Sequence, residues 1–104
     1  MKGIVYYQDK KAGTIRQTDE GYQFQYDPSY VSDTTSMPIS QTLPLRAEVY
    51  SSKTLFSFFD GLIPEGWLLD VAVETWKINP KDRMKLLLTV CQDCIGAVKI
   101  VNEN

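Results

Sequence analysis

Cys91 and Cys94 are the two residues of this chain whose spacing is typical of redox or metal chemistry. A redox-active pair of this kind lies at the N-terminal end of a helix, where the helix dipole lowers the pKa of a thiol. These two cysteines are expected at the C-terminal end of a helix, where the dipole opposes the thiolate. A tetrahedral zinc site needs four ligands, and the chain has two cysteines and no histidine. We therefore interpret both cysteines as small, semi-buried apolar side chains, and we expect neither a metal nor a cofactor.

Catalytic groups are scarce in the sequence. The absence of histidine removes the commonest general base. No glycine-rich loop of the phosphate-binding type occurs, and the carboxylates are scattered singly apart from Asp19 and Glu20, which share a predicted turn. We therefore expect that the protein is not an enzyme and that it has no catalytic residues of its own.

Trp67 and Val71 are apolar residues that we expect on the water-exposed side of a helix over residues 65–77. Helical residues at i, i+3, i+4 and i+7 share one side, because successive residues rotate by about 100°. The inward stripe of this type consists of Leu69, Ala72, Val73 and Trp76. Trp67 and Val71 then point nearly opposite, with Asp70 and Glu74 on the flank. Tryptophan is enriched at interface hot spots, which favours a partner anchor. The alternative is that the first helical turn folds onto the neighbouring loop and buries Trp67 locally.

Three residues just before this helix, Pro64, Glu65 and Gly66, are typical of a helix start. Glu65 would interact favourably with the positive end of the helix dipole, by about 0.3–1 kcal/mol. Gly66 lets the backbone bend, or lets another chain approach closely. From these residues alone, both a simple helix start and a contact with a partner remain open.

The first half of the chain is predicted to form an antiparallel meander of three strands with one apolar side. The expected strands cover residues 3–7, 14–18 and 22–26, with turns at 9–13 and 19–21. The third strand alternates strictly and places three aromatic side chains on one face. Residues 29–36 are rich in Ser, Thr and Asp and are predicted to form a loop. Residues 38–45 are predicted to be extended, because their prolines rule out a helix. Residues 46–52 fit either a short strand or a loop.

The second half is predicted to form three helices and a last strand. The helices are expected over residues 54–62, 65–77 and 80–92, and the strand over 97–101. Asn79 is the expected cap of the third helix and Pro80 its first residue. The inward stripe of that helix consists of Met84, Leu87, Leu88 and Cys91. Strands followed by helices predict an α+β fold, in which a small, mostly antiparallel sheet is covered on one face by two or three helices.

Size and charge limit the possible classes of protein. The chain has 104 residues, of which 43% are hydrophobic, so we expect one domain over residues 1–104. The net charge of -2 argues against direct binding to nucleic acid, which usually needs a basic surface. No signal peptide is evident, and no stretch approaches the roughly 20 apolar residues that cross a bilayer. We therefore expect a cytoplasmic protein without a membrane segment.

Several segments resemble one family, the HipA N-terminal domain. Residues 58–66 are similar to its "FF-x-x-L-L-P-E-G" signature, and residues 38–45 to its "P-L-S-x-S-L-P-L" element. Residues 24–27 match its "F-x-Y-D" strand end. Leu86 and Leu87, with residues 92–98, resemble its "L-L … G-x-D-C-x-G-A-V" close. The segments occur in the order of the family and span about residues 3–101. Cys91 departs from the pattern, since the family tends to have glycine there.

The resemblance implies a function in a bacterial toxin–antitoxin system. HipA proteins are serine/threonine kinase toxins whose N-terminal domain packs on a much larger kinase core, and this sequence ends where that core would begin. The chain is most similar in kind to HipS, the stand-alone form in three-component HipBST systems, where it neutralises a shortened HipA-like kinase. A helix-turn-helix protein that binds operator DNA completes such a complex. We therefore expect an antitoxin that binds and inhibits a HipA-like kinase.

The expected binding surface is the corner formed by Pro64, Glu65, Gly66 and Trp67, together with Asp70, Val71 and Glu74. Trp67 would block the kinase active-site cleft, and the three carboxylates would meet basic groups that otherwise handle phosphate. One alternative is a structural subunit that completes a split kinase without inhibiting it. A second is a component that bridges the kinase to a DNA-binding repressor, and a third is a fragment of a longer kinase.

Overall fold

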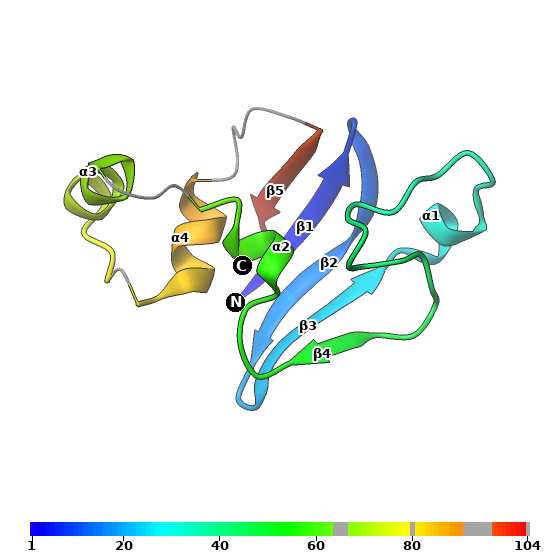
Figure 1. The fold of residues 1–104 in the computed structure, drawn as a ribbon, viewed down its shortest axis with the longest axis horizontal. Coiled ribbons are helices and arrows are strands. Elements are labelled where there is room, and N and C mark those ends of the chain that lie inside the picture. The colour runs from blue at the N-terminus through cyan, green and yellow to red at the C-terminus, as the bar shows by residue number, and fades with distance from the viewer. Residues whose placement is uncertain (64–66, 80, 91–96, 104) are drawn as a thin grey trace.

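The protein is an α+β domain built on one five-stranded antiparallel sheet, as predicted (Figure 1). The computed structural model describes residues 1–63, 67–79, 81–90 and 97–103, apart from the side chains of residues 67, 68, 72 and 76. The strands are β1 (Lys2–Tyr7), β2 (Lys10–Thr18), β3 (Gly21–Tyr26), β4 (Tyr50–Ser52) and β5 (Val98–Asn102). The helices are α1 (Pro28–Ser32), α2 (Ser57–Asp60), α3 (Trp67–Trp76) and α4 (Arg83–Val90). The order of strands across the sheet is β4-β3-β2-β1-β5.

The first hairpin turns earlier than predicted. Gln8 and Asp9 both have positive φ, 49° and 67°, and β2 begins directly after them at Lys10. This matches a two-residue hairpin turn, in which both central residues adopt the left-handed region. The predicted turn over residues 9–13 is therefore wrong for its last four residues. A β-bulge at Ala12 interrupts the alternation of inward and outward residues in β2. The first residues of this strand therefore lack the alternating pattern of a strand, and their polar composition suggested a turn.

The third strand confirms the predicted alternation of aromatic residues. Phe24 and Tyr26 are fully buried, and Tyr22 is half-buried against the same core. The Phe24 ring meets the ring of Tyr26 at 4.9 Å and that of Phe59 in α2 at 5.4 Å, measured between centroids. The core therefore lies between this face of the sheet and the segments that cover it.

Helix α1 lies in the segment that was predicted to be a loop. Pro28 occupies the start of the helix, where its fixed φ suits the helical conformation. Tyr30 is buried and stacks on Tyr26, with a centroid distance of 5.9 Å and an interplanar angle of 3°. Its hydroxyl donates to the Met37 carbonyl at 2.5 Å. The Ser- and Asp-rich composition predicted a loop, because composition does not indicate that one aromatic residue of the segment is buried and holds it against the core.

The segment over residues 38–45 folds back on itself instead of extending. Ser40 and Leu43 form an isolated bridge, and the side chains of Ile39 and Leu43 are buried. The Tyr26 hydroxyl holds this turn, since it accepts from the Ile39 N–H at 3.1 Å and donates to the Leu43 carbonyl. Burial raises the pKa of Tyr26 to about 12. The undecided stretch that follows contains β4 at its end, as the edge strand beside β3.

The helical half agrees with the prediction in order but not in every boundary. Helix α2 is shorter than predicted, because Phe56 is still extended, with φ -55° and ψ 139°. Helix α4 begins at Arg83 instead of Pro80, a residue that lies outside the described ones. The Asp82 carboxylate accepts from the Lys85 N–H at 3.2 Å and is therefore the cap that Asn79 was expected to provide. The side chain of Asn79 instead accepts from the N–H of Lys81 and so caps a turn.

Helix α4 carries the first three residues of its predicted inward stripe, and the fourth, Cys91, lies outside the described residues. Met84, Leu87 and Leu88 are buried, and Leu86 is buried as well, which the periodicity did not indicate. Leu88 packs so closely on β1 that a Cβ at Gly3 would lie 2.6 Å from its methyl carbon. Helices α2 and α4 thus cover the core face of the sheet, and α3 lies beyond α4 at one end of the molecule (Figure 1).

Candidate partner-binding site

Helix α3 belongs to the segment over residues 61–82 between α2 and α4, which we call the excursion, and Ile63 and Ile78 near its two ends are buried in the core. The two ends of this excursion are joined by an ion pair, in which Arg83 Nε donates to Asp60 Oδ1 at 2.7 Å. Their side chains are 29% and 44% exposed, so water still reaches the pair. We call this contact the clamp. It fixes the base of the excursion, and it was not foreseen from the sequence because its two residues lie 23 positions apart.

The described side chains of α3 have the orientation that the apolar spacing predicted. Leu69 and Val73 are half-buried and pack against the hydrophobic core. Val71 is 51% exposed, and Asp70 and Glu74 are exposed as well. The inward stripe is thus present in the part that the structure describes, whereas the side chains of Ala72 and Trp76 lie outside it.

The central residue of the predicted site remains a prediction. Trp67 is the first residue of α3, and its side chain lies outside the described residues. Pro64, Glu65 and Gly66 also lie outside them. The structure therefore brings three of the seven predicted contact residues, Asp70, Val71 and Glu74, to one exposed side of α3.

The exposed side of α3 is acidic. Asp70 and Glu74 are separated by one helical turn, so their like charges repel each other by about 0.2–0.5 kcal/mol. Neither carboxylate forms an ion pair with another described residue. A cation supplied by a partner would relieve this repulsion. Helix α3 ends at Trp76, because the next residue, Lys77, has a φ of 55° that stops the helical path.

The described residues contain no cluster of three or more His, Cys, Asp or Glu side chains that could hold a metal ion. An open hollow of about 600 Å³ beside β4 is lined by Thr18, Glu20, Tyr22, Ser52 and Lys53 among others. Its hydroxyl groups have no histidine to activate them, because the chain has none. Cys91 and Cys94 lie outside the described residues, and no described helix is long and apolar enough to span a bilayer.

Comparison with known proteins gives relatives of two sizes. The chain is 32% identical over 101 residues to an uncharacterized protein of Haemophilus influenzae, and the match covers 97% of this chain and 92% of that protein. It is 29% identical over 101 residues to the putative kinase Y4mE of Sinorhizobium fredii, of which the match covers only 24%. The same domain therefore occurs both in a chain of similar length and as about a quarter of a longer one.

Solved structures agree with this relationship. The N-terminal domain of HipA toxin superposes with a TM-score of 0.76 at 27% identity, over 99% of this chain and 92% of that one. A chain of the Shewanella oneidensis toxin–antitoxin complex of HipA, HipB and operator DNA has the same fold, with a TM-score of 0.77 at 20% identity. That match covers 98% of this chain and 24% of the other. The sequence pattern of the HipA N-terminal domain matches residues 3–101. This chain therefore belongs to the HipA N-terminal domain family.

Proposed function

We propose that this protein is an antitoxin that binds a HipA-like serine/threonine kinase toxin and neutralises it. Membership of the HipA N-terminal domain family supports a role beside such a kinase. The Haemophilus influenzae relative of similar length supports a domain of this kind that acts as a separate chain. The protein would work by obstruction, without chemistry of its own.

The observation that carries this proposal is the outward side of α3. Val71 is 51% exposed with two carboxylates on one flank, neither of which forms an ion pair with another described residue, whereas the opposite side of the same helix packs on the core. An exposed apolar side chain rimmed by polar groups is typical of a protein interface. The charges suit a kinase cleft, since such clefts use basic groups to hold phosphate.

In the proposed mechanism, the start of α3 docks at or near the active-site cleft of the kinase. Trp67 would be the wedge, with Pro64 and Gly66 allowing close approach. Glu65, Asp70 and Glu74 would pair with the basic groups that otherwise bind ATP or phosphate. Both effects would exclude the nucleotide or the protein substrate from the cleft.

Replacement of Trp67 with alanine tests this mechanism. We expect Trp67→Ala to weaken binding to the kinase by about 2–4 kcal/mol and to abolish protection of co-expressing cells. Calorimetry with the purified kinase and growth assays measure the two effects. Trp76→Ala is the matched control, because Trp76 belongs to the predicted inward stripe and its loss should lower stability more than affinity. Full protection and unchanged affinity in Trp67→Ala would overturn the wedge.

A structural subunit is the second candidate function. The putative kinase Y4mE supports it, because there the domain is about a quarter of a longer chain. In that case the protein would complete a split kinase without inhibiting it. Phosphorylation assays with and without the small chain separate the two functions, since a completing subunit leaves kinase activity unchanged or raises it and an antitoxin lowers it.

A bridge to a DNA-binding repressor is the third candidate, and it is compatible with either of the others. The Shewanella oneidensis complex, in which HipA and HipB occur with operator DNA, supports it. We expect no direct nucleic-acid binding by this chain, so a gel shift with the chain alone should be negative. A shift should appear only when a helix-turn-helix partner is added.

A further inference from the structure

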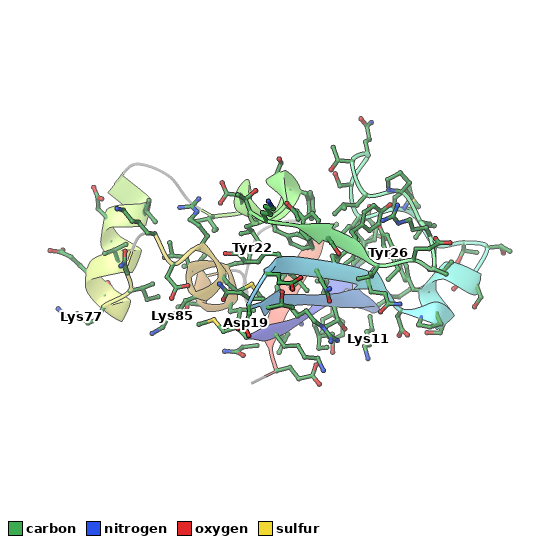
Figure 2. The ribbon with its side chains drawn as sticks, turned by 90° about the horizontal axis from the view of Figure 1, so that it is seen from below. Lys11, Asp19, Tyr22, Tyr26, Lys77 and Lys85 are labelled. Atoms are coloured by element: carbon green, nitrogen blue, oxygen red, sulfur yellow. The ribbon has the colours of Figure 1, made fainter. Side chains whose placement is uncertain are left out.

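The face of the sheet that the helices leave uncovered is basic. The strands contain five Lys or Arg residues and no Asp or Glu, although the whole chain carries a net charge of -2. Four of the five, Lys2, Lys11, Arg16 and Lys99, are placed by register and alternation on the side opposite the core. Figure 2 shows Lys11 on this side, pointing away from the layer that contains α2. We call this surface the open face.

The open face has an apolar centre with cations on both sides. Val101 pairs with Ile4 across the sheet, and these residues are 37% and 9% exposed. The neighbouring cross-strand row consists of Lys99, Tyr6 and Lys11, with the Lys99 amine 5.4 Å from the centre of the Tyr6 ring. Arg16 lies in the row on the other side, beside Lys2. This arrangement of an apolar centre and a charged rim is typical of a protein interface.

Three of these cations have no carboxylate partner among the described residues. Lys2 pairs with Glu103 at 3.6 Å, whereas Lys11, Arg16 and Lys99 form no ion pair there. Glu48 lines a shallow hollow beside Arg16, so the face is not uniformly positive. A mixture of this kind suits a protein surface better than a nucleic acid, which favours a continuous basic surface.

The outward side of α3 has the complementary pattern. Val71 lies within one helical turn of two carboxylates, Asp70 and Glu74, that have no ion-pair partner among the described residues. The exposed Val71, with carboxylates on one flank, thus complements an apolar centre that has cations on both sides. A helix laid across a sheet face is also an ordinary way to bury both surfaces.

We propose that the open face binds α3 of a second copy of this chain in a head-to-tail contact. Such a contact uses different surfaces on the two copies, so each pair leaves one α3 and one open face free for further copies. The inference goes beyond the proposed function, and it concerns the chain by itself. It has a regulatory consequence, because self-association covers the side of α3 that the kinase would bind.

The contact should be weak and sensitive to salt. A ten-residue helix is about 15 Å long, so it covers less than the roughly 800 Å² per partner of a standard interface. Its charged groups lie at the surface, where salt screens them. Sedimentation velocity of the chain alone should show an average mass that rises with protein concentration above 11.9 kDa at about 0.02 M salt, and less so at about 0.5 M.

Two charge-reversed variants give the decisive test. Asp70→Lys with Glu74→Lys removes the acidic side of α3, and Arg16→Glu with Lys99→Glu removes the basic rim of the open face. Each variant alone should associate at least about tenfold more weakly, because like charges then face each other. A 1:1 mixture should recover association, since each variant retains the surface that the other has lost.

Two matched controls exclude an effect of net charge alone. Asp19→Lys with Glu20→Lys changes the net charge as the α3 variant does, and Lys53→Glu with Lys81→Glu changes it as the open-face variant does. These four residues are exposed and lie outside both surfaces, so both controls should associate like the original chain. Circular dichroism should show that every variant is folded.

These measurements decide whether the isolated chain associates through α3 and the open face. A wild-type mass that stays monomeric at millimolar concentration would overturn the proposal, and so would reversed variants that associate as strongly as their controls. Recovery in the mixture, with unchanged controls, would support it. None of these measurements contains a kinase, so failure here leaves the proposed antitoxin function to be judged by its own test.

Discussion

The sheet and the α3 excursion differ in how firmly they are held. Side chains in β1, β2 and β3 include fully buried residues such as Val5, Ile15 and Phe24. In α3, by contrast, none of the described side chains is buried, and the helix lies at one end of the molecule. Stability is therefore concentrated in the sheet, and α3 is a helix with low local stability that is available for binding.

Under the proposed function, this difference separates two tasks. The sheet, α2 and α4 share one core and give the domain its stability. The excursion contributes Ile63 and Ile78 to that core and Leu69 and Val73 to its edge, and the other described side chains of α3 are exposed. A change in the sheet should affect folding, whereas a change on the outward side of α3 should affect partners.

The largest effect is expected from Phe24→Ala. Phe24 is fully buried and contacts the rings of Tyr26 and Phe59. Its loss should lower the free energy of unfolding by about 3–5 kcal/mol, measured by urea denaturation. An unchanged free energy of unfolding would mean that the core face of the sheet is not the main source of the stability of the domain.

Tyr26→Phe should have the next largest effect. The hydroxyl bonds to Ile39 and Leu43, so its removal leaves buried backbone groups without a partner and costs about 1–3 kcal/mol. Because the pKa is raised to about 12 in the folded state from 10.0, the tyrosine stabilises the fold below pH 10. This contribution should be lost between pH 10 and about 12 and should be absent from the variant. An equal loss in both proteins over this range would assign it to other groups.

Asp60→Ala should separate stability from binding. The clamp is partly exposed, so its loss should cost only about 0.2–1 kcal/mol of global stability. Amide exchange in α3 should nevertheless become faster, because the base of the excursion is released. Asp33→Ala, which removes the more exposed pair with Lys10, is the matched control and should leave α3 unchanged. Equal exchange in both variants would show that the clamp does not hold the excursion.

The smallest effect on stability is expected from Val71→Ser. Val71 is 51% exposed, so the free energy of unfolding should change by less than about 0.5 kcal/mol. Binding to the kinase should weaken in calorimetry, because the exposed apolar centre of α3 is lost. Met37→Ser, at another exposed apolar residue, is the control and should leave binding unchanged. A large fall in stability with unchanged affinity would reverse the roles assigned to the two regions.

Much of the fold could be predicted because local patterns decided it. The alternating aromatics of β3 and the stripe of Met84, Leu87 and Leu88 in α4 each follow one period, and both are confirmed. Helix α1 could not be predicted in the same way. It depends on the stacking of Tyr30 on Tyr26, which joins residues that no sequence period relates.

Only part of the candidate site could be predicted from the sequence. The helical spacing correctly placed Val71 opposite Leu69 and Val73. The clamp and the open face could not be found from spacing, because they depend on strand register and on contacts between distant segments. The bulge at Ala12 is one example, since it changes which residues of β2 lie on each face.

The clamp also makes the excursion a modular insert. Its two ends meet at the clamp and bury Ile63 and Ile78 in the core, so the rest of the domain constrains the stretch between these two residues less than it constrains the ends. The entropy of closing a loop grows only slowly with its length. A change in the length of this stretch should therefore have little effect on the scaffold that carries it.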